Sequence, residues 1–420
     1  MNANLIKAGI WIFIYTCLPL TVCCQQQARV DFYQAPPPSF VNVGENIIQN
    51  SPQLKPFFEK LFQERTQKNK IINIVHIGDS HLQADLMTAI VRQNFHRHFG
   101  NAGRGLVVPC KVAGSNEPLN FSTWSNVKWE AKRCVFPEKP LPVGVGGITI
   151  KTTDPTAYIA LKTCDAAADL QYGFDDITLF IDKPNSFAFD IKTNDGQTLA
   201  TLDKNQNAFD NHTLKTYLPT KIHEIKLQVK KNDESETHAT IYGMVLGNSH
   251  DGIMYHTIGV NGAQYDHYDR ARYFVEQLPS LNPDLIIISL GTNEAQTADY
   301  NETIFRMEVM RLIAKIKQKN AGVPIILTSP ADSYRKKIQS NPQLFSVRNV
   351  IVQQAQANGL AYWDLYQIGG GQNSADQWKA HNLLRPDGLH YTQPGYELQG
   401  NLFFHALMNA YNQYVELRPE

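Results

Sequence analysis

Apolar runs alternate with helix-like segments near the start and along the second half of the chain. The largely apolar run Ile71–Ile77 is typical of a buried parallel strand, and His81–Phe99 then carries apolar residues at helical spacing. A shorter helix is expected at Pro52–Lys68. The same alternation returns in the strand-like runs Asp284–Leu290, Pro324–Thr328 and Leu360–Leu365 and in the helix-like segments Ile304–Lys317 and Gly395–Tyr414. Strands that lead directly into amphipathic helices predict an α/β fold with a parallel sheet.

A different pattern occupies the middle of the chain, between about Lys111 and Tyr242. Here short segments of alternating polarity, rich in β-branched and aromatic residues, are separated by turn residues, which predicts an antiparallel β-sandwich. We expect the sandwich to be inserted into the α/β domain, because the first strand and helix need a sheet to join. The alternative is two sequential domains that meet near residue 245.

The N-terminal segment has the pattern of an export signal. Lys7 precedes the apolar run Ala8–Cys24, which is shorter than the ~20 residues of a spanning helix and is interrupted by Pro19. Cleavage after Cys24 would yield an exported protein, in the periplasm, at the outer membrane or cell surface, or secreted. Two alternatives stay open: lipidation of Cys23 or Cys24, which would tether the protein to a membrane, and an uncleaved anchor.

These patterns divide the chain into five ranges. In chain order they are a signal peptide at 1–24, a linker at 25–50, the first part of the α/β domain at 51–112, the inserted sandwich at 113–242 and the second part of the α/β domain at 243–420. The linker is inferred from its polar start and its Ala-Pro-Pro-Pro sequence.

Composition and charge narrow the function. The 420 residues include 39 Lys and Arg against 39 Asp and Glu, and this zero net charge argues against a nucleic-acid partner. The contents of 43% hydrophobic and 19% charged residues are typical of a globular protein. The six cysteines form no Cys-x-x-Cys pair, so a structural zinc site is not expected. If the signal is removed, Cys110, Cys134 and Cys164 remain and allow one disulfide, whose pairing stays open.

Two motifs contain residues suited to nucleophilic catalysis. Ser80 follows the first predicted strand and begins a helix, where a nucleophilic hydroxyl would lie beside free backbone N–H groups. His390 lies three residues after Asp387; a serine nucleophile needs a histidine base, and the second nitrogen of that base needs a carboxylate. Taken alone, Ser80 could be a helix cap and Asp387-x-x-His390 a surface turn.

Two further motifs offer hydrogen-bond donors for an oxyanion. Asn293, in Gly-Thr-Asn-Glu after the strand Asp284–Leu290, carries a carboxamide. Gly262, or less favourably Gly259, provides an unobstructed backbone N–H in the loop that follows the strand-like sequence IMYHTI. Each motif alone is an ordinary turn, but together they lie where ligands bind in parallel sheets, outside the carboxyl ends of the strands.

The four motifs, in the order Ser, Gly, Asn and Asp/His, resemble those of the SGNH hydrolase superfamily, also called the GDSL esterases and lipases. The resemblance covers about Ile71–Cys110 and Gly243–Tyr414 and leaves the sandwich outside. It implies a flavodoxin-like, three-layer α/β/α domain with the antiparallel β-sandwich inserted. It also implies an ester-hydrolysing enzyme that uses no metal and no organic cofactor.

The same resemblance assigns a role to each motif. Ser80 would be the nucleophile, His390 the general base, and Asp387 the carboxylate that orients the histidine. The oxyanion hole would be formed by three donors, namely the backbone N–H groups of Ser80 and Gly262 and the side chain of Asn293. Asp79 would shape the Ser80 turn without taking part in the chemistry.

A finer resemblance concerns the substrate. The phrases HIGDSHLQAD, YHTIGVNGAQ, YWDLYQIGGG and DGLHYTQPGYELQG, with a β-rich insertion, look like those of bacterial envelope peptidoglycan O-acetylesterases. They imply hydrolysis of O-acetyl or other short acyl esters on peptidoglycan or another polysaccharide. The alternatives are a lipase or lysophospholipase that acts on longer acyl esters, an SGNH-type O-acetyltransferase and, outside the enzymes, a glycan-binding envelope protein.

Two polar residues near Ser80 carry weaker expectations. Asp85, early in the predicted helix His81–Phe99, is expected only to interact with the helix dipole. His81 is expected either to line the pocket or to face solvent.

Overall fold

The computed structural model describes residues 28–33, 35–207, 210 and 212–418. The predicted signal peptide and its cysteines lie outside these residues. None of the helices in the described ranges is both long and apolar enough to cross a membrane.

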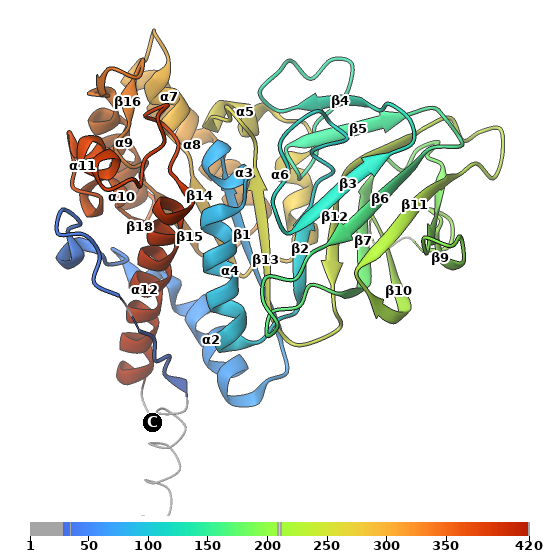
Figure 1. The fold of residues 1–420 in the computed structure, drawn as a ribbon, viewed down its shortest axis with the longest axis horizontal. Coiled ribbons are helices and arrows are strands. Elements are labelled where there is room, and N and C mark those ends of the chain that lie inside the picture. The colour runs from blue at the N-terminus through green and yellow to red at the C-terminus, as the bar shows by residue number, and fades with distance from the viewer. Residues whose placement is uncertain (1–27, 34, 208–209, 211, 419–420) are drawn as a thin grey trace, which may run out of the picture.

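A five-stranded parallel sheet forms the centre of the α/β domain, in the order β13-β1-β14-β15-β18 (Figure 1). The strands are β1 (Ile71–Gly78), β13 (Gly252–Gly259), β14 (Leu285–Ser289), β15 (Ile325–Thr328) and β18 (Ala361–Trp363). Gly78, the last residue of β1, is in register with Gly259 of β13 and with Ser289 of β14. The carboxyl ends of three neighbouring strands therefore meet at one edge of the sheet.

Helices cover both faces of this sheet, because successive strand residues point to opposite faces and are apolar on each. On one face, Ile72 and Ile74 of β1 share a core with α2 (Lys55–Gln67), α4 (Leu86–Phe99) and α12 (Gln393–Leu417). On the other, Val75 and Ile77 share a core with α5 (Tyr265–Arg270), α6 (Phe274–Gln277), α8 (Glu302–Lys319) and α9 (Gln343–Ala357). The predicted α/β class with three layers is thereby confirmed.

Short elements complete the domain. They are α3 (Ser80–Gln83), α7 (Thr292–Gln296), α10 (Leu365–Ile368), α11 (Ser374–Ala380), β16 (Tyr334–Arg335), β17 (Gln339–Ser340) and the 3₁₀ turns Val43–Glu45, Ser51–Leu54 and Leu278–Leu281.

Two antiparallel sheets lie between the first helices and β13 in the sequence. One has the order β10-β7-β12-β5-β4, with β2 also paired to β12, and the other has the order β3-β6-β11-β8-β9. Their strands are β2 (Gly103–Val107), β3 (Phe121–Ser125), β4 (Glu130–Arg133), β5 (Ile148–Thr152), β6 (Tyr158–Thr163), β7 (Phe174–Ile181), β8 (Ala188–Lys192), β9 (Thr198–Leu202), β10 (Thr213–Ile222), β11 (Glu224–Lys230) and β12 (Ala239–Gly247). Apolar residues of both sheets form one shared core. The predicted antiparallel strands are therefore present, and Figure 1 shows them beside the parallel sheet.

The strand β2 connects this sandwich to the parallel sheet. It falls within the range 51–112, which was expected to belong to the α/β domain, yet it pairs with β12 of the sandwich. On the other side, the N–H of Leu106 donates to Nδ1 of His256 in β13 at 3.2 Å. The hydrogen bonding of the sandwich thus begins before residue 113, and β2 contacts both parts at their junction.

The segment expected as a linker at 25–50 packs against the α/β domain wherever the structure describes it. Ala28, Val30, Val41 and Ile48 are buried in the core that includes α12. Val30 exchanges two backbone hydrogen bonds of 2.9 Å with the carboxamide of Asn412. The described residues of this segment are therefore packed against the domain rather than forming a free linker. The sequence does not reveal this packing, because isolated apolar residues between polar and proline residues show no periodicity.

A buried ion cluster joins the first helices to the sandwich. The predicted helix His81–Phe99 is two helices, α3 and α4, which meet at Asp85 with a φ of 57°. The Asp85 carboxylate is buried and accepts from Thr88, Arg92, Arg104, Asn120 and Thr257. Burial opposes ionisation of Asp85, but Arg92 and Arg104 outweigh it and hold its pKa below the ordinary value. Asp85 is therefore a structural anion rather than a dipole partner.

We expect Asp85→Asn to lower the free energy of unfolding by about 3–5 kcal/mol, because it leaves two buried guanidinium groups without their shared counter-ion. Urea unfolding followed by circular dichroism measures the change. The control is Asp169→Asn, which removes the exposed partner of Arg97 and should cost about 1 kcal/mol or less. Equal effects of the two substitutions would contradict a structural role for the Asp85 cluster.

Candidate active site

The turn after β1 leaves the Ser80 hydroxyl outside the helix cap. Asp79 caps the short helix α3, because its Oδ1 accepts from the N–H of His81 at 2.9 Å. Ser80 is the first helical residue and is partly exposed. The capping role that Ser80 could have played is thus filled by its neighbour, and the Ser80 hydroxyl is left for another partner.

That partner is His390, which lies in the loop before α12. Ser80 Oγ is 2.9 Å from His390 Nε2, and His390 Nδ1 is 3.0 Å from Asp387 Oδ2. Asp387 Oδ1 also accepts from the backbone N–H groups of Leu389 and His390, each at 2.9 Å. With Nδ1 donating to the carboxylate, Nε2 is the acceptor for the serine proton. The structure thus brings together the three residues predicted as nucleophile, base and orienting acid.

The pKa of Asp387 is lowered despite partial burial. Desolvation raises the pKa, but the N–H groups of Leu389 and His390 and the His390 ring together outweigh desolvation. Asp387 is therefore ionised at neutral pH and can stabilise a protonated His390 ring.

The loop after β13 places Gly262 and Gly259 in different environments. Gly262 has a left-handed φ of 82°, and its N–H has no acceptor among the described residues. The N–H of Ser80 likewise has no acceptor in the described part of the chain. At Gly259, by contrast, a Cβ would lie 2.4 Å from the backbone nitrogen of Gln83. Gly259 therefore permits close packing of α3 on β13, while Gly262 offers the open donor.

Asn293, the second residue of α7, lies beside the same turn, and its amide already donates two hydrogen bonds. Its Nδ2 donates to Asp79 Oδ2 at 3.1 Å and to the carbonyl oxygen of Ala263 at 3.0 Å. The carboxamide thereby bridges the nucleophile turn and the Gly262 loop. An oxyanion that accepted from Asn293 would have to share or replace one of these two bonds.

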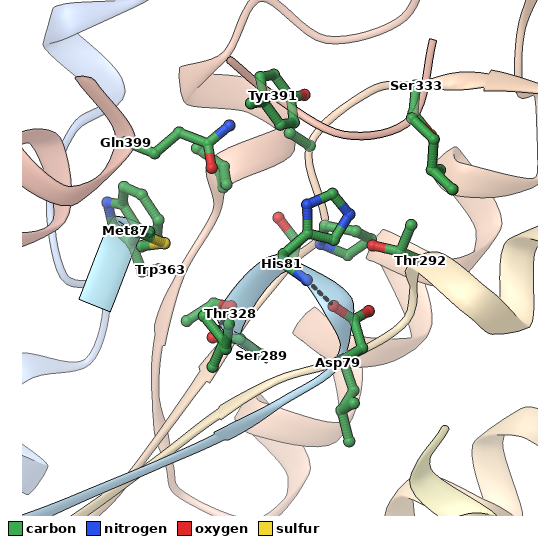
Figure 2. A pocket seen from close by; sticks show the side chains of 17 residues that line it. Asp79, His81, Met87, Ser289, Thr292, Thr328, Ser333, Trp363, Tyr391 and Gln399 are labelled. Atoms are coloured by element: carbon green, nitrogen blue, oxygen red, sulfur yellow. Dashed lines mark hydrogen bonds between the residues drawn. The ribbon is translucent and has the colours of Figure 1, made fainter. Parts of the chain in front are cut away.

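A small cavity of about 40 Å³ lies behind the nucleophile turn. Figure 2 shows Asp79 and His81 side by side along it, joined by the hydrogen bond of the helix cap. Its lining also includes the buried side chains of Ser333 and Gln399, whose Oγ and Nε2 have no partner within the described ranges. Its size and these polar atoms fit a few ordered water molecules rather than an acyl chain.

The His81 ring lies beside the ring of His390, the predicted base, and is kept neutral. Its ring centroid is 5.3 Å from that of His390, and its Nδ1 is 2.9 Å from the hydroxyl of Tyr396. Burial, reinforced by His390, lowers the pKa of His81 to about 3. His81 therefore lines the site, and Tyr396, to which the sequence assigned no role, holds its ring.

No metal centre accompanies this site in the described part of the chain: no group of three or more His, Cys, Asp or Glu side chains there could hold an ion. Cys110 and Cys134 are buried, Cys164 is exposed, and all three thiols are free.

Comparison with known proteins bears on the class of the protein. Residues 233–398 match the GDSL-like lipase/acylhydrolase family. A solved structure described as a peptidoglycan O-acetylesterase in action is similar over 86% of this chain and 97% of its own, with a TM-score of 0.70 at 20% identity. The match over residues 233–398 and the similar fold support an ester-hydrolysing enzyme of the SGNH type.

Other similar structures cover less of the chain. A lipase/acylhydrolase from Enterococcus faecalis is 21% identical over 40% of this chain and 80% of its own, with a TM-score of 0.30. An acylhydrolase from Bacteroides fragilis is 21% identical over 37% of this chain and 76% of its own, with a TM-score of 0.28. No curated protein matches the chain by sequence.

Because Asp79 is buried, we expect the free energy of unfolding to depend on pH. Desolvation raises the pKa of Asp79 to about 7, although the His81 N–H opposes this. The folded state therefore binds the Asp79 proton more tightly than the unfolded chain does. The stabilising contribution of this proton is present at low pH and is lost as the pH rises from about 4 to about 7.

In Asp79→Asn this titration is absent. The quantity to compare is the free energy of unfolding of wild type minus that of the variant. We expect this difference to be smaller at pH 8 than at pH 4.5, by an amount on the order of a few kcal/mol. Urea titrations at both pH values measure it. Asp169→Asn serves as the exposed control. A difference between wild type and Asp79→Asn that does not change with pH would contradict the raised pKa.

Proposed function

We propose that the protein is an exported serine esterase that hydrolyses O-acetyl or other short acyl esters on a polysaccharide, with peptidoglycan as the leading substrate. The observation that carries the proposal is the hydrogen-bonded chain from Ser80 through His390 to Asp387. This chain supports ester hydrolysis by a serine nucleophile, because such an arrangement activates a hydroxyl at neutral pH.

In the first half of the proposed reaction, Ser80 Oγ attacks the ester carbonyl carbon while His390 Nε2 takes the serine proton. The carbonyl oxygen becomes an oxyanion that accepts from the N–H groups of Ser80 and Gly262 and from Asn293. When the intermediate collapses, the bond to the leaving sugar oxygen breaks, and His390 returns the proton to that oxygen. The acyl group remains on Ser80 as an ester.

In the second half, His390 takes a proton from water, whose oxygen attacks the acyl carbon. Collapse breaks the bond to Ser80 Oγ, which recovers its proton from His390, and acetate leaves. Asp387 stays ionised throughout and stabilises the protonated ring.

The substrate proposal draws on three supports. The similar solved structure is described as a peptidoglycan O-acetylesterase and aligns over the sandwich as well as the α/β domain. The N-terminal pattern at 1–24 favours export, with a membrane tether through Cys23 or Cys24 as an option of that proposal. Outside the cytoplasm, glycans are the main polymers that carry such esters.

We expect Ser80→Ala to lower kcat on O-acetylated peptidoglycan and on p-nitrophenyl acetate by at least ~10³-fold, because the nucleophile is lost. Ser333→Ala, which shortens a buried serine without a hydrogen-bond partner, is the matched control and should retain wild-type rates. A loss of less than tenfold in Ser80→Ala would contradict the proposed mechanism.

The length of the preferred acyl chain and the identity of the acyl acceptor distinguish the proposed esterase from the alternative functions. We expect wild-type kcat/KM to be higher for acetyl esters than for esters of eight or more carbons, and acetate to be the product with O-acetylated peptidoglycan or acetylated xylan. A preference for long acyl chains would instead indicate a lipase, and net acetyl gain by a glycan would indicate an acetyltransferase. Binding of glycan with no turnover of any ester would indicate a glycan-binding protein.

A further inference from the structure

The side chain of Gln83 connects three parts of the site. Gln83 is the last residue of α3 and is buried. Its Oε1 accepts from the N–H of Asn261 at 2.6 Å, and its Nε2 donates to Ser115 Oγ at 2.7 Å and to the carbonyl oxygen of Asn116 at 2.9 Å. The carboxamide thus uses both of its donor hydrogens and its acceptor oxygen.

These three partners belong to separate segments. Asn261 immediately precedes Gly262, whose N–H is the open donor of the loop after β13. Ser115 and Asn116 lie between β2 and β3, within the inserted range, and the N–H of Ser115 is tied back to the Cys110 carbonyl at 2.8 Å. One side chain on the nucleophile helix therefore joins the Gly262 loop to the insert.

The insert also reaches the Gly262 loop from a second direction. A Cβ on Gly262 would have Val135 Cγ1 as its neighbour, at 3.9 Å. Val135 follows β4 of the sandwich and packs against the core that includes Val260 and Ala263 of the loop. The Gly262 loop is therefore bordered by insert residues on two sides.

Other hydrogen bonds also hold the loop near its free donor, among them the bond from Asn293 Nδ2 to the Ala263 carbonyl at 3.0 Å. The N–H of Val260 donates to the Gly78 carbonyl at 3.4 Å, and the N–H of Ala263 donates to the Val260 carbonyl within the loop at 2.9 Å. Gly262 itself has a left-handed φ, and the neighbour that a Cβ there would meet within 4 Å is Val135 Cγ1. The 2.6 Å bond from Asn261 to Gln83 joins the loop directly to the helix that carries Ser80, beside the indirect link through Asn293 and Asp79.

We infer that Gln83 is a positioning residue that sets the Gly262 N–H relative to Ser80, and that the inserted sandwich is part of the framework of the oxyanion hole. The inference rests on the proposed function, because it assigns Gly262 to the oxyanion. A donor displaced by about 1 Å loses much of its stabilisation of the transition state, up to about 10²-fold in rate, while ground-state binding changes little.

The first test is Gln83→Met, which keeps the length of the side chain and removes all three hydrogen bonds. With p-nitrophenyl acetate we expect kcat to fall about 10–100-fold and KM to stay within about threefold. The rate should be expressed per active site, titrated with a phosphonate that reacts with the serine, so that misfolded protein is not counted. The affinity for a reversible boronate that mimics the tetrahedral intermediate should fall by the same factor as kcat/KM.

The second test is Gln83→Glu, which separates the two sides of the link. The acceptor for the Asn261 N–H remains, but an ionised glutamate cannot donate to the Asn116 carbonyl. Burial raises the pKa of such a carboxyl, and the protonated form regains a donor. We therefore expect the ratio of variant to wild-type kcat to rise as the pH is lowered, which a role in folding alone would not produce.

The matched control is Gln399→Met, the same substitution at another buried glutamine, whose Nε2 has no partner in the described part of the chain. It should retain wild-type kcat per titrated site. If Gln83→Met also retains it, or if Gln83→Glu shows a ratio that does not change with pH, the inference is overturned. Activity that survives Ser80→Ala would instead overturn the proposed function, so the two failures are distinguishable.

Discussion

The position of β1 between β13 and β14 is the constraint on which the site depends. Because the three strands are parallel and in register at Gly78, the turns that follow them leave the sheet at one edge. Ser80, Gly262 and Asn293 are far apart in the chain, yet each follows one of these strands. The sheet therefore assembles the nucleophile and the donors without long loops, and only the His390 segment comes from beyond it.

At that edge, Asp79 performs two structural functions at once. One carboxylate oxygen caps α3 and so leaves the Ser80 hydroxyl free, and the other accepts from Asn293. Because no cation pairs with this carboxylate in the described part of the chain, burial raises its pKa. Asp85, six residues later, is equally buried but lies between Arg92 and Arg104, and its pKa is lowered. The two acids show that counter-ions, rather than depth, decide the charge state here.

The sequence predicted the parts of the molecule that local patterns encode. The strands at Ile71–Ile77 and Asp284–Leu290 and the helix around Ile304–Lys317 are present, with ends shifted by a few residues. The proximity of Ser80, Asp387 and His390 was also foreseen, through their motifs. The break at Asp85, the packing of the described residues between 28 and 50 and the hydrogen bonds of Gln83 were not foreseen, because each depends on contacts with residues distant in sequence. The helix α9 (Gln343–Ala357) was also missed, although its apolar spacing is visible in the chain.

The central claim is that Ser80 is activated by His390 to form a covalent intermediate. Labelling with a fluorophosphonate tests it most directly, because attack by the serine oxygen displaces fluoride and leaves a stable phosphonyl ester. Peptide mass spectrometry should find one adduct per chain, on Ser80, and His390→Ala should slow its formation strongly. A protein that hydrolyses esters yet carries the label elsewhere, or carries none, would contradict the account.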